Sequence, residues 1–425
     1  MSCETAMSTC PGDRAVRTSG FRLAMKHDPL AERANDCGPN VAPSSSRCLA
    51  WVPDGIRVGA VTRVLSNVAL LIGSLVVAIL VAEGLLRLTE QRYALVRVEF
   101  PDGYFTSDPV VGARQAVNRP PAIFRFPGPP FETFTNSLGC FDIEQSIEPG
   151  YVLVIGDSAT WGYVPAAENW ATHLGRLIGR QVVKCGVTGI GTRYETVVLQ
   201  RLVELIGRPP SAVILLYTKN DLNDDVVYPS YRVVDGQRLD AFRSLDLTTG
   251  RLDRYTDAEL AAEYAEYRKG RSSIRQWMRE NSLVAWVVYR ALVGRREKPT
   301  PPKISSRYEV ELWDLDDTDR PWLRAAKASH IDHLLALSER VHDLGASFIV
   351  FDHDVGPHNR TLAERLSGRA DFYHQLTFDD AGKPGSERYL HRFDGHWNVE
   401  GNRMAADAMS RALHASMVLD QAPGE

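Results

Sequence analysis

A serine, a histidine and an aspartate lie in sequence contexts that could support nucleophilic catalysis. Ser158 lies in the segment Gly156–Gly162, directly after the apolar run 151–155. Such a run is typical of a buried parallel strand, and open α/β folds bind ligands at the carboxyl ends of their strands. Because Gly-Asp-Ser is also ordinary turn chemistry, Ser158 alone predicts little, and its interpretation depends on partners elsewhere in the chain.

The best partners for Ser158 lie near the C-terminus. A serine hydroxyl needs a base to become a good nucleophile, and His396 is the candidate base. Asp394 is the candidate acid that would hold the imidazole in the required tautomer. On an extended segment, residues two apart point to the same side, so we expect these two side chains to meet. Asn398 is expected to cap the final helix and so to give the pair a rigid mount. A surface turn at Asp394-Gly395 is the alternative, which the presence of Ser158 disfavours.

Acyl transfer also needs hydrogen-bond donors for an oxyanion, and two segments could supply them. The loop Gly186–Thr192 follows the second predicted strand, and its glycines leave backbone N–H groups accessible. A dinucleotide-binding loop is the alternative there, but the full GxGxxG spacing is absent. Asn220 follows the third predicted strand and could donate from its side-chain amide. The acidic residues beside it are interpreted as solvated loop charges rather than metal ligands: Asp221, Asp224 and Asp225.

Alternation of apolar strands and amphipathic helices predicts an α/β fold with a parallel sheet covered on both faces. Strands are predicted at 151–156, 181–186, 211–217 and 347–352. Helices are predicted at 168–179, 192–206, 320–344, 359–367 and 398–416. The polar cluster after the fourth strand, Asp352-His353-Asp354, is interpreted as structural or substrate-lining.

Two further segments flank or interrupt this pattern. Residues 100–150 are rich in Pro and aromatic side chains and are expected to form an irregular lead-in that packs on the α/β domain. A helical insertion is expected at about 226–320. Its predicted helices are one that opens with a Thr256/Glu259 capping box and one over the apolar stretch 282–293.

The N-terminal part divides into an extension and an apolar segment. Residues 1–60 lack periodicity and are rich in Ser, Pro and Gly, so disorder is expected. Within 61–88, the run 64–82 has no charged residue and is close to the ~20 apolar residues that span a bilayer. A buried core helix and a cleaved signal peptide are the alternatives, but the length and all-round apolarity favour one transmembrane helix. Arginines on both sides leave its orientation open.

Composition narrows the function classes. The 425 residues carry a net charge of -4 with no basic block, which argues against a nucleic-acid partner. The chain has no CxxC motif and no Cys/His spacing that is typical of a metal site. Cys140 and Cys185 are the two cysteines outside the N-terminal extension. A disulfide between them is one alternative, but two unpaired buried thiols are the favoured interpretation.

Taken in order, these blocks resemble those of the SGNH, or GDSL-type, hydrolase superfamily. Gly156-Asp157-Ser158 is similar to the first block, which carries the nucleophile, and Gly189 matches the oxyanion glycine of the second. Asn220 is similar to the third-block asparagine, and His396 to the base of the last block. The resemblance implies a flavodoxin-like three-layer α/β/α sandwich over 150–419 without metal or organic cofactor. It also implies a catalytic triad of Ser158, His396 and Asp394. The oxyanion hole that it implies consists of Ser158, Gly189 and Asn220.

Two positions depart from the family pattern. Thr218 stands where the third block usually has Gly, and the acid lies two rather than three residues before His396. The shorter gap is similar to that in the branch that acts on bacterial exopolysaccharides and is related to alginate O-acetylation proteins.

The resemblance implies a membrane-anchored serine esterase or O-acyltransferase that acts on acylated envelope or secreted glycans. It places the protein in the bacterial inner membrane, with the catalytic domain outside the cytoplasm. One alternative is a lipase, lysophospholipase or thioesterase of the same fold, with a lipid substrate. Another is a non-catalytic, membrane-tethered glycan-binding or assembly protein.

Overall fold

The computed structural model describes residues 58–269, 281–293, 303–304, 306, 309–376 and 388–419. The chain separates into two units, Met1–Asn67 and Val68–Glu425. Disorder was expected for residues 1–60. Residues 1–57 lie outside the described residues, and residues 58–60 belong to a helix.

Five parallel strands form the central sheet, in the order β14-β13-β7-β5-β6. They are β5 (Val152–Gly156), β6 (Val182–Gly186), β7 (Ala212–Tyr217), β13 (Ser347–Asp352) and β14 (Phe372–Gln375). Numbered along the chain, this is the order 2-1-3-4-5 of flavodoxin-like folds. The four predicted strands are confirmed. The fifth, β14, was not predicted, because its four half-buried residues at the sheet edge show no apolar run.

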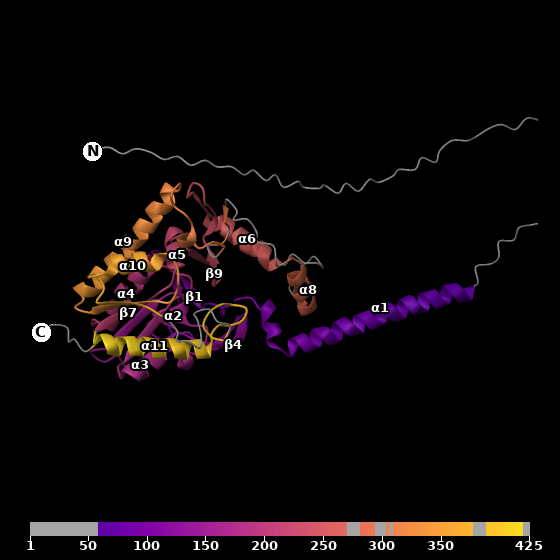
Figure 1. Cartoon of the computed structure of the whole chain (residues 1–425), viewed down its shortest axis with the longest axis horizontal. Coiled ribbons are helices and arrows are strands. Elements are labelled where there is room, and N and C mark those ends of the chain that lie inside the picture. Colours follow the sequence, from indigo (N-terminus) through magenta and orange to yellow (C-terminus); the bar gives the residue numbers. More distant parts are fainter. Residues whose placement is uncertain are drawn as a thin grey trace, which may run out of the picture. The chain divides into compact units, whose positions relative to one another are not determined.

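Alternate residues of each strand pack on opposite faces of the sheet. Leu153 and Ile155 pack with helices on one face, and Val152 and Val154 with helices on the other. The first face carries α4 (Thr192–Ile206), α9 (Pro321–Asp343) and α10 (His358–Leu366), and the second carries α3 (Trp170–Ile178) and α11 (Val399–Ser416) (Figure 1). The expected three-layer α/β/α sandwich is therefore confirmed.

The segment 100–150 is more regular than expected. It contains two antiparallel hairpins, β1 (Phe105–Asp108) with β2 (Gly112–Gln115), and β3 (Ala122–Phe126) with β4 (Gly128–Thr133). The interpretation as an irregular lead-in is corrected, because Phe124 and Phe126 alternate with exposed residues as a half-buried strand requires. The buried aromatic side chains of this segment pack on the α/β domain at Trp161 and Tyr163.

The insertion between β7 and β13 is mixed rather than helical. It holds a hairpin of β8 (Tyr231–Val234) and β9 (Gln237–Asp240), a sheet of β10 (Phe242–Asp246), β11 (Leu252–Arg254) and β12 (Lys303–Ile304), and the helices α6 (Asp257–Lys269) and α8 (Leu283–Val293). The two-residue turn of the hairpin is Asp235-Gly236, both with positive φ. Asp-Gly is a strong hairpin signal that the sequence analysis overlooked. The capping box before α6 is present, since the Glu259 carboxylate accepts from the Thr256 N–H at 2.8 Å.

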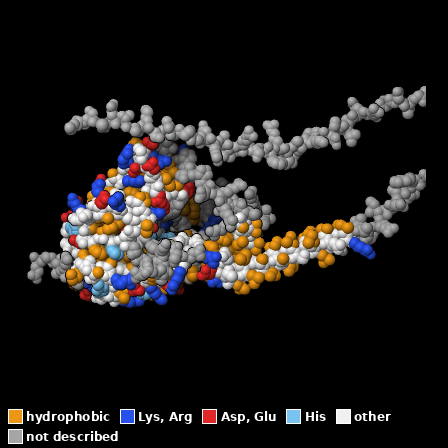
Figure 2. All heavy atoms as spheres, in the orientation of Figure 1, with side chains coloured by type: hydrophobic (Ala, Val, Ile, Leu, Met, Phe, Trp, Pro, Cys, Tyr) orange, Lys and Arg blue, Asp and Glu red, His pale blue; other side chains and the backbone are white. Residues whose placement is uncertain are grey.

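The apolar N-terminal segment forms one continuous helix, α1 (Val58–Arg87). Figure 2 shows hydrophobic side chains along it, and none of its most apolar window is buried within the protein. By length and composition, α1 is able to cross a membrane.

Cys140 and Cys185 form a disulfide, so the favoured interpretation as two free thiols is wrong. Cys185 lies on β6, and Cys140 lies in the turn that follows β4. The close packing of that turn on the sheet brings their Cα atoms to 4.9 Å, inside the range that a disulfide spans.

Removal of this disulfide should destabilise the domain. The bond closes a loop of 45 residues, and cross-links of that size typically contribute about 2–4 kcal/mol. We expect Cys140→Ala with Cys185→Ala to lower the free energy of unfolding by that amount, measured by urea denaturation. Dithiothreitol should produce a similar loss in the wild type and none in the variant. Equal unfolding midpoints for wild type and variant under oxidising conditions would contradict the expectation.

Candidate active site

Ser158 lies at the carboxyl edge of the sheet, directly after β5. Asp157 caps the short helix α2 (Ser158–Trp161), because its carboxylate accepts from the Ala159 N–H at 2.9 Å. Gly156 has φ 147°, and a Cβ there would lie 2.3 Å from the Thr160 Oγ1, so this sharp turn requires glycine. As the first residue of α2, Ser158 has an amide N–H with no acceptor within the helix.

His396 and Asp394 complete a continuous hydrogen-bonded chain with Ser158. The Ser158 Oγ lies 2.9 Å from the His396 Nε2, across 238 residues of sequence. The His396 Nδ1–H donates to the Asp394 carboxylate, which leaves Nε2 free to accept the serine proton. Burial alone would raise the pKa of the Asp394 carboxyl, but the charge of His396 and hydrogen bonds from its ring and backbone hold that pKa below its usual value. The structure therefore brings together all three predicted triad side chains.

Asp394 and His396 meet through a turn, not along an extended segment as expected. Gly395 between them has φ 92°, and its N–H donates to the His391 C=O at 3.0 Å. The His391 N–H donates to the His396 C=O at 2.8 Å, which closes the turn. The predicted cap after the turn is confirmed, because the Asn398 side chain accepts from the Gly401 N–H at 3.0 Å at the start of α11.

Tyr163 was not predicted as a site residue, although it directly follows the Ser158 block. Its ring stacks on the His396 imidazole, with centroids 3.8 Å apart and planes 14° apart. Its carbonyl accepts a hydrogen bond from the His391 Nε2 at 2.9 Å, which ties it to the same turn. The imidazole is thus fixed by a carboxylate at Nδ1 and by an aromatic face.

The two other expected oxyanion donors are placed differently. Asn220 lines the same cavity as Ser158, but its amide donates to Asp157 at 3.1 Å and to Asp224 at 3.2 Å. Gly189 lies in the turn after β6, with φ 67°, and is buried. It is not among the described residues that line the cavity. The structure therefore brings Asn220 to the cavity that Ser158 lines, whereas Gly189 is buried and does not line it.

The acidic residues after Asn220 are buried, which corrects their interpretation as solvated loop charges. Asp221 opens a short helix, α5 (Asp221–Val226), and its carboxylate accepts from the Thr218 hydroxyl at 2.9 Å. Asp225 bonds the His330 ring at 2.7 Å. The burial follows from close packing of α5 on the glycine loop, where a Cβ at Gly191 would lie 2.4 Å from the Asp221 carbonyl.

A further carboxyl group joins this buried set from α4. Glu195 is fully buried, and neither carboxyl oxygen meets a hydrogen-bond partner within normal geometry. Burial and the neighbouring carboxylates raise the pKa of both Glu195 and Asp221 well above the usual range. This environment therefore favours the neutral form of both carboxyl groups.

A cavity of about 440 Å³ opens over the triad. Its lining includes Tyr163 and Trp397 beside the triad, and Lys219, His353 and Asp354 after β7 and β13. His353 and Asp354 thus line the cavity. Asp352 is fully buried and accepts from the Asn359 amide at 2.6 Å and the Tyr373 hydroxyl at 2.9 Å, which makes it structural.

Glu311 reaches this cavity from the insertion, and no signal in the sequence pointed to it. Its Oε2 is buried and has no hydrogen-bond partner. Burial is the main cause that raises the pKa of the Glu311 carboxyl to about 7; Lys219 lowers this pKa, and the nearby Asp354 and Asp314 contribute to raising it. Lys219 itself pairs with Asp314 at 3.2 Å. The cavity therefore contains a carboxyl group that titrates near neutral pH. In the described part of the chain, no three His, Cys, Asp or Glu side chains gather as a metal site.

No protein-family model matches the chain. A comparison with curated proteins also finds no match. Among solved structures, the chain is similar to a putative lipolytic protein of the G-D-S-L family from Desulfitobacterium hafniense, at 14% identity and TM-score 0.32, over 62% of this chain and 99% of that one. It is similar to TesA at 10% identity and TM-score 0.33, over 63% and 99%.

A third similar structure is a carbohydrate esterase family 2 enzyme with a carbohydrate-binding domain from Corynascus thermopiles (Myceliophthora fergusii). Identity is 9% and the TM-score 0.29, over 68% of this chain and 71% of that one.

The Glu311 carboxyl should make stability depend on pH. Its pKa is raised in the folded state, so the folded protein holds a proton that the unfolded chain releases above about pH 4.5. We expect the free energy of unfolding to fall between about pH 4.5 and 7, by at most about 1.4 kcal/mol per pH unit from this group. In Glu311→Gln this contribution should vanish, measured by urea denaturation at a series of pH values. An unchanged slope in the variant would contradict the assignment.

Proposed function

We propose that the protein is a membrane-anchored serine esterase or O-acyltransferase of the SGNH type, acting on ester-linked acyl groups of envelope or secreted glycans. The observation that carries the proposal is the unbroken chain from Ser158 through His396 to Asp394 at the floor of an open cavity. This arrangement supplies nucleophile, base and orienting acid within hydrogen-bond reach.

In the first half-reaction, the Ser158 Oγ attacks the ester carbonyl while the His396 Nε2 takes the hydroxyl proton. Asp394 holds the ring with Nε2 facing the serine and stabilises the imidazolium that forms. The stacked face of Tyr163 supports the same cation, because aromatic rings attract positive charge. His396 then delivers the proton to the leaving alcohol, and the acyl group remains on Ser158.

The oxyanion hole combines the Ser158 N–H with Asn220 and Gly189. The Ser158 N–H is available because it is the first N–H of α2. It belongs to the same residue as the attacking Oγ, so it lies close to the ester carbon that Ser158 attacks. Asn220 must release one of its two carboxylate acceptors to donate to an oxyanion. Gly189 must come forward from its buried turn. The hole is therefore completed when substrate binds, a tightening that is common in hydrolase sites.

The second half-reaction depends on what enters the cavity. Water gives hydrolysis, and a sugar hydroxyl gives transfer. Polar groups on the lining, among them Lys219, His353 and Asp354, suit a hydroxyl-rich substrate. The glycans that reach the cavity therefore decide which acyl group is removed and which hydroxyl group receives it.

We infer that the catalytic domain lies outside the cytoplasm, anchored to a bacterial inner membrane. The uncharged run 64–82 of α1, whose large apolar side chains are exposed, supports single-pass anchoring. The Cys140–Cys185 disulfide supports an oxidising compartment, because cytosolic thiols are kept reduced.

The two rival functions receive less support. A lipid-processing enzyme would need an apolar groove for an acyl chain, and the apolar stretch 282–293 could line such a groove. No described residue of α8, which this stretch forms, lines the cavity. A non-catalytic binding protein has no need of a triad with this geometry.

Replacement of any triad member should abolish most ester cleavage. We expect Ser158→Ala and His396→Ala to lower kcat/KM by at least about a thousandfold, because the residual rate comes only from binding and the oxyanion hole. The assay is acyl-ester hydrolysis by the detergent-solubilised full chain, with p-nitrophenyl acetate and acetylated oligosaccharides.

The matched control is His342→Ala, which removes an imidazole that also bonds an aspartate, Asp371, at an exposed position. This control should keep wild-type activity. Wild-type turnover no better than that of Ser158→Ala on every ester would refute the proposal. Mass spectrometry with and without an added oligosaccharide distinguishes free acid, the product of hydrolysis, from an acylated sugar, the product of transfer.

Tyr163 should act through the position and charge of His396. We expect Tyr163→Leu to lower kcat about tenfold with little change in KM, because an aromatic stack contributes about 0.5–1.5 kcal/mol. Tyr163→Phe keeps the ring and should retain most activity. Equal loss in the Leu and Phe variants would speak against the stack.

A further inference from the structure

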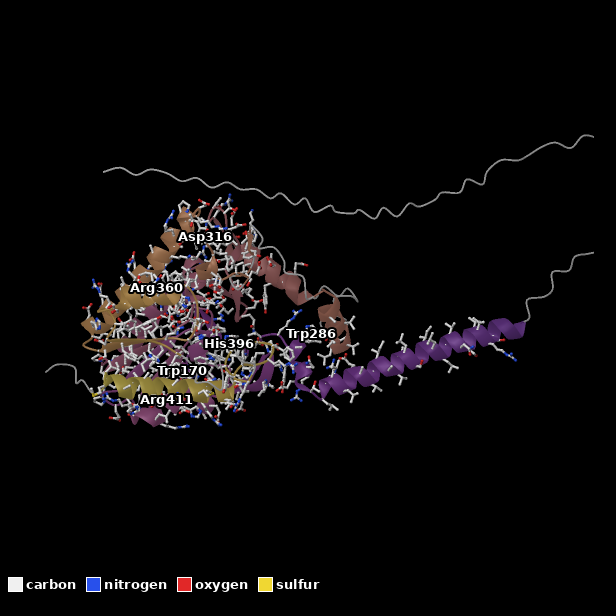
Figure 3. The ribbon with its side chains drawn as sticks, viewed as in Figure 1. Trp170, Trp286, Asp316, Arg360, His396 and Arg411 are labelled. Atoms are coloured by element: carbon white, nitrogen blue, oxygen red, sulfur yellow. A yellow bond between two sulfur atoms is a disulfide. The ribbon has the colours of Figure 1, made fainter. Side chains whose placement is uncertain are left out.

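The helix α8 of the insertion is fastened to the end of α1. The Glu83 carboxylate accepts from the N–H groups of Leu283 at 3.1 Å and Val284 at 3.0 Å, and from the Ser282 hydroxyl at 3.2 Å. These are the orphan amides of the first turn of α8, so a residue of α1 caps a helix about 200 positions later in the chain. Arg87 adds a hydrogen bond to the Asn281 carbonyl at 2.8 Å. Figure 3 shows Trp286 on α8 beside this end of α1.

The surface of α8 is apolar and partly uncovered. Its sequence is LVAWVVYRALV, with one charged residue in eleven. Leu283 is buried against its neighbours, but Val287 and Val288 are 38% and 51% exposed. An exposed apolar helix face of this kind marks an interaction surface rather than a core element.

The surroundings of α8 indicate which partner covers this face. The apolar surface of α1 ends with exposed Leu85, next to the residues that cap α8. A 3-10 turn, η1 (Glu90–Leu95), contacts α8 and carries Arg92, whose guanidinium bonds the Tyr93 hydroxyl at 2.6 Å. Basic and aromatic side chains just beyond an apolar span are typical of the boundary between bilayer and water.

We propose that α8 docks in the interfacial region of the bilayer that α1 spans, with Val287 and Val288 facing the lipid. The proposal rests on the membrane anchorage proposed above for α1. The Glu83 cap fixes the start of α8 at the level where α1 leaves the membrane, and the apolar face then has the acyl boundary within reach.

The docked helix also reaches the catalytic turn. The Trp286 ring packs edge-on against Phe393, with centroids 5.8 Å apart, and Phe393 adjoins Asp394 in the chain. The bilayer would therefore support the turn that carries Asp394 and His396 and hold the cavity close to the membrane surface, where a membrane-bound glycan or glycan carrier presents its ester.

Site-specific fluorescence of the full chain in lipid vesicles tests the proposal. The four N-terminal cysteines are replaced by serine, and Cys140 and Cys185 stay in their disulfide. A nitrobenzoxadiazole label is attached in turn through Val288→Cys on α8, Leu75→Cys within α1 and Leu205→Cys on α4. These side chains are 51%, 59% and 62% exposed, so labelling should not disturb the fold. The vesicles contain phosphatidylcholine and phosphatidylglycerol, with or without doxyl-labelled phosphatidylcholine.

We expect doxyl lipid to quench the label at residue 288 by at least about half as much as the label at 75, because an interfacial helix lies at shallow depth. The label at 205 should lose less than about a tenth of its emission to the same quencher. Adding Val287→Asp to the Val288→Cys chain should reduce the quenching at 288 by half or more.

Each other outcome overturns the proposal and locates the failure. Quenching at 75 but not at 288 leaves the anchor intact and rejects docking of α8. Absence of quenching at 75 rejects the anchor itself, and docking with it. A blue-shifted label at 288 that doxyl lipid does not quench indicates a protein surface, such as a second copy of this chain, in place of the bilayer.

Discussion

The geometry of the site depends on one buried hydrogen-bond path that joins the nucleophile to its base. The Trp170 Nε1 donates to the Ala159 carbonyl on α2, and the Trp170 N–H donates to the Asn402 Oδ1 on α11, both at 3.0 Å. Asn402 in turn donates to the Trp397 carbonyl at 3.1 Å, one residue from His396. The Trp170 and Asn402 side chains are buried, so breaking a link that they make would leave an unsatisfied polar atom at a cost of about 1–3 kcal/mol. The path explains how Ser158 and His396 hold a 2.9 Å contact across 238 residues (Trp170 and His396 in Figure 3).

A second constraint is electrostatic. The turn that carries Ser158 stands on buried carboxyl groups, and an ionised cluster of that kind would be costly. The raised pKa of Glu195 and of Asp221 favours their neutral forms, and the Asn220 amide donates to Asp157 and Asp224, so both features reduce this cost. Asn220 therefore has a structural duty in the resting state, which competes with any duty as an oxyanion donor. Asn220 can therefore bind the two carboxylates in the resting state and donate one N–H to an oxyanion when substrate is bound.

The parts of the fold that could be predicted from sequence are those with strong local signals. Four strands have buried apolar runs, and Asn398 and Thr256 mark helix starts by their capping chemistry. What could not be predicted depends on tertiary packing. Glu311 has no local signal, since its raised pKa arises from burial in a cavity shared with Asp354. The disulfide likewise follows from the approach of a turn to β6, which cysteine counting cannot reveal. For the same reason the positions of the predicted oxyanion donors, which depend on loop conformation, could not be derived from the sequence.

The spacing of the acid and the base, which seemed a departure from the family pattern, follows from the turn that joins them. A two-residue gap along an extended strand would place the side chains about 7 Å apart along the backbone. Gly395, at φ 92°, folds the chain back so that the carboxylate reaches the Nδ1 of the imidazole. A residue with a Cβ is strained at that backbone angle, so the glycine between acid and base is what allows the short gap. The short Asp-x-His spacing therefore does not weigh against catalysis, because the contact that the chemistry needs is present.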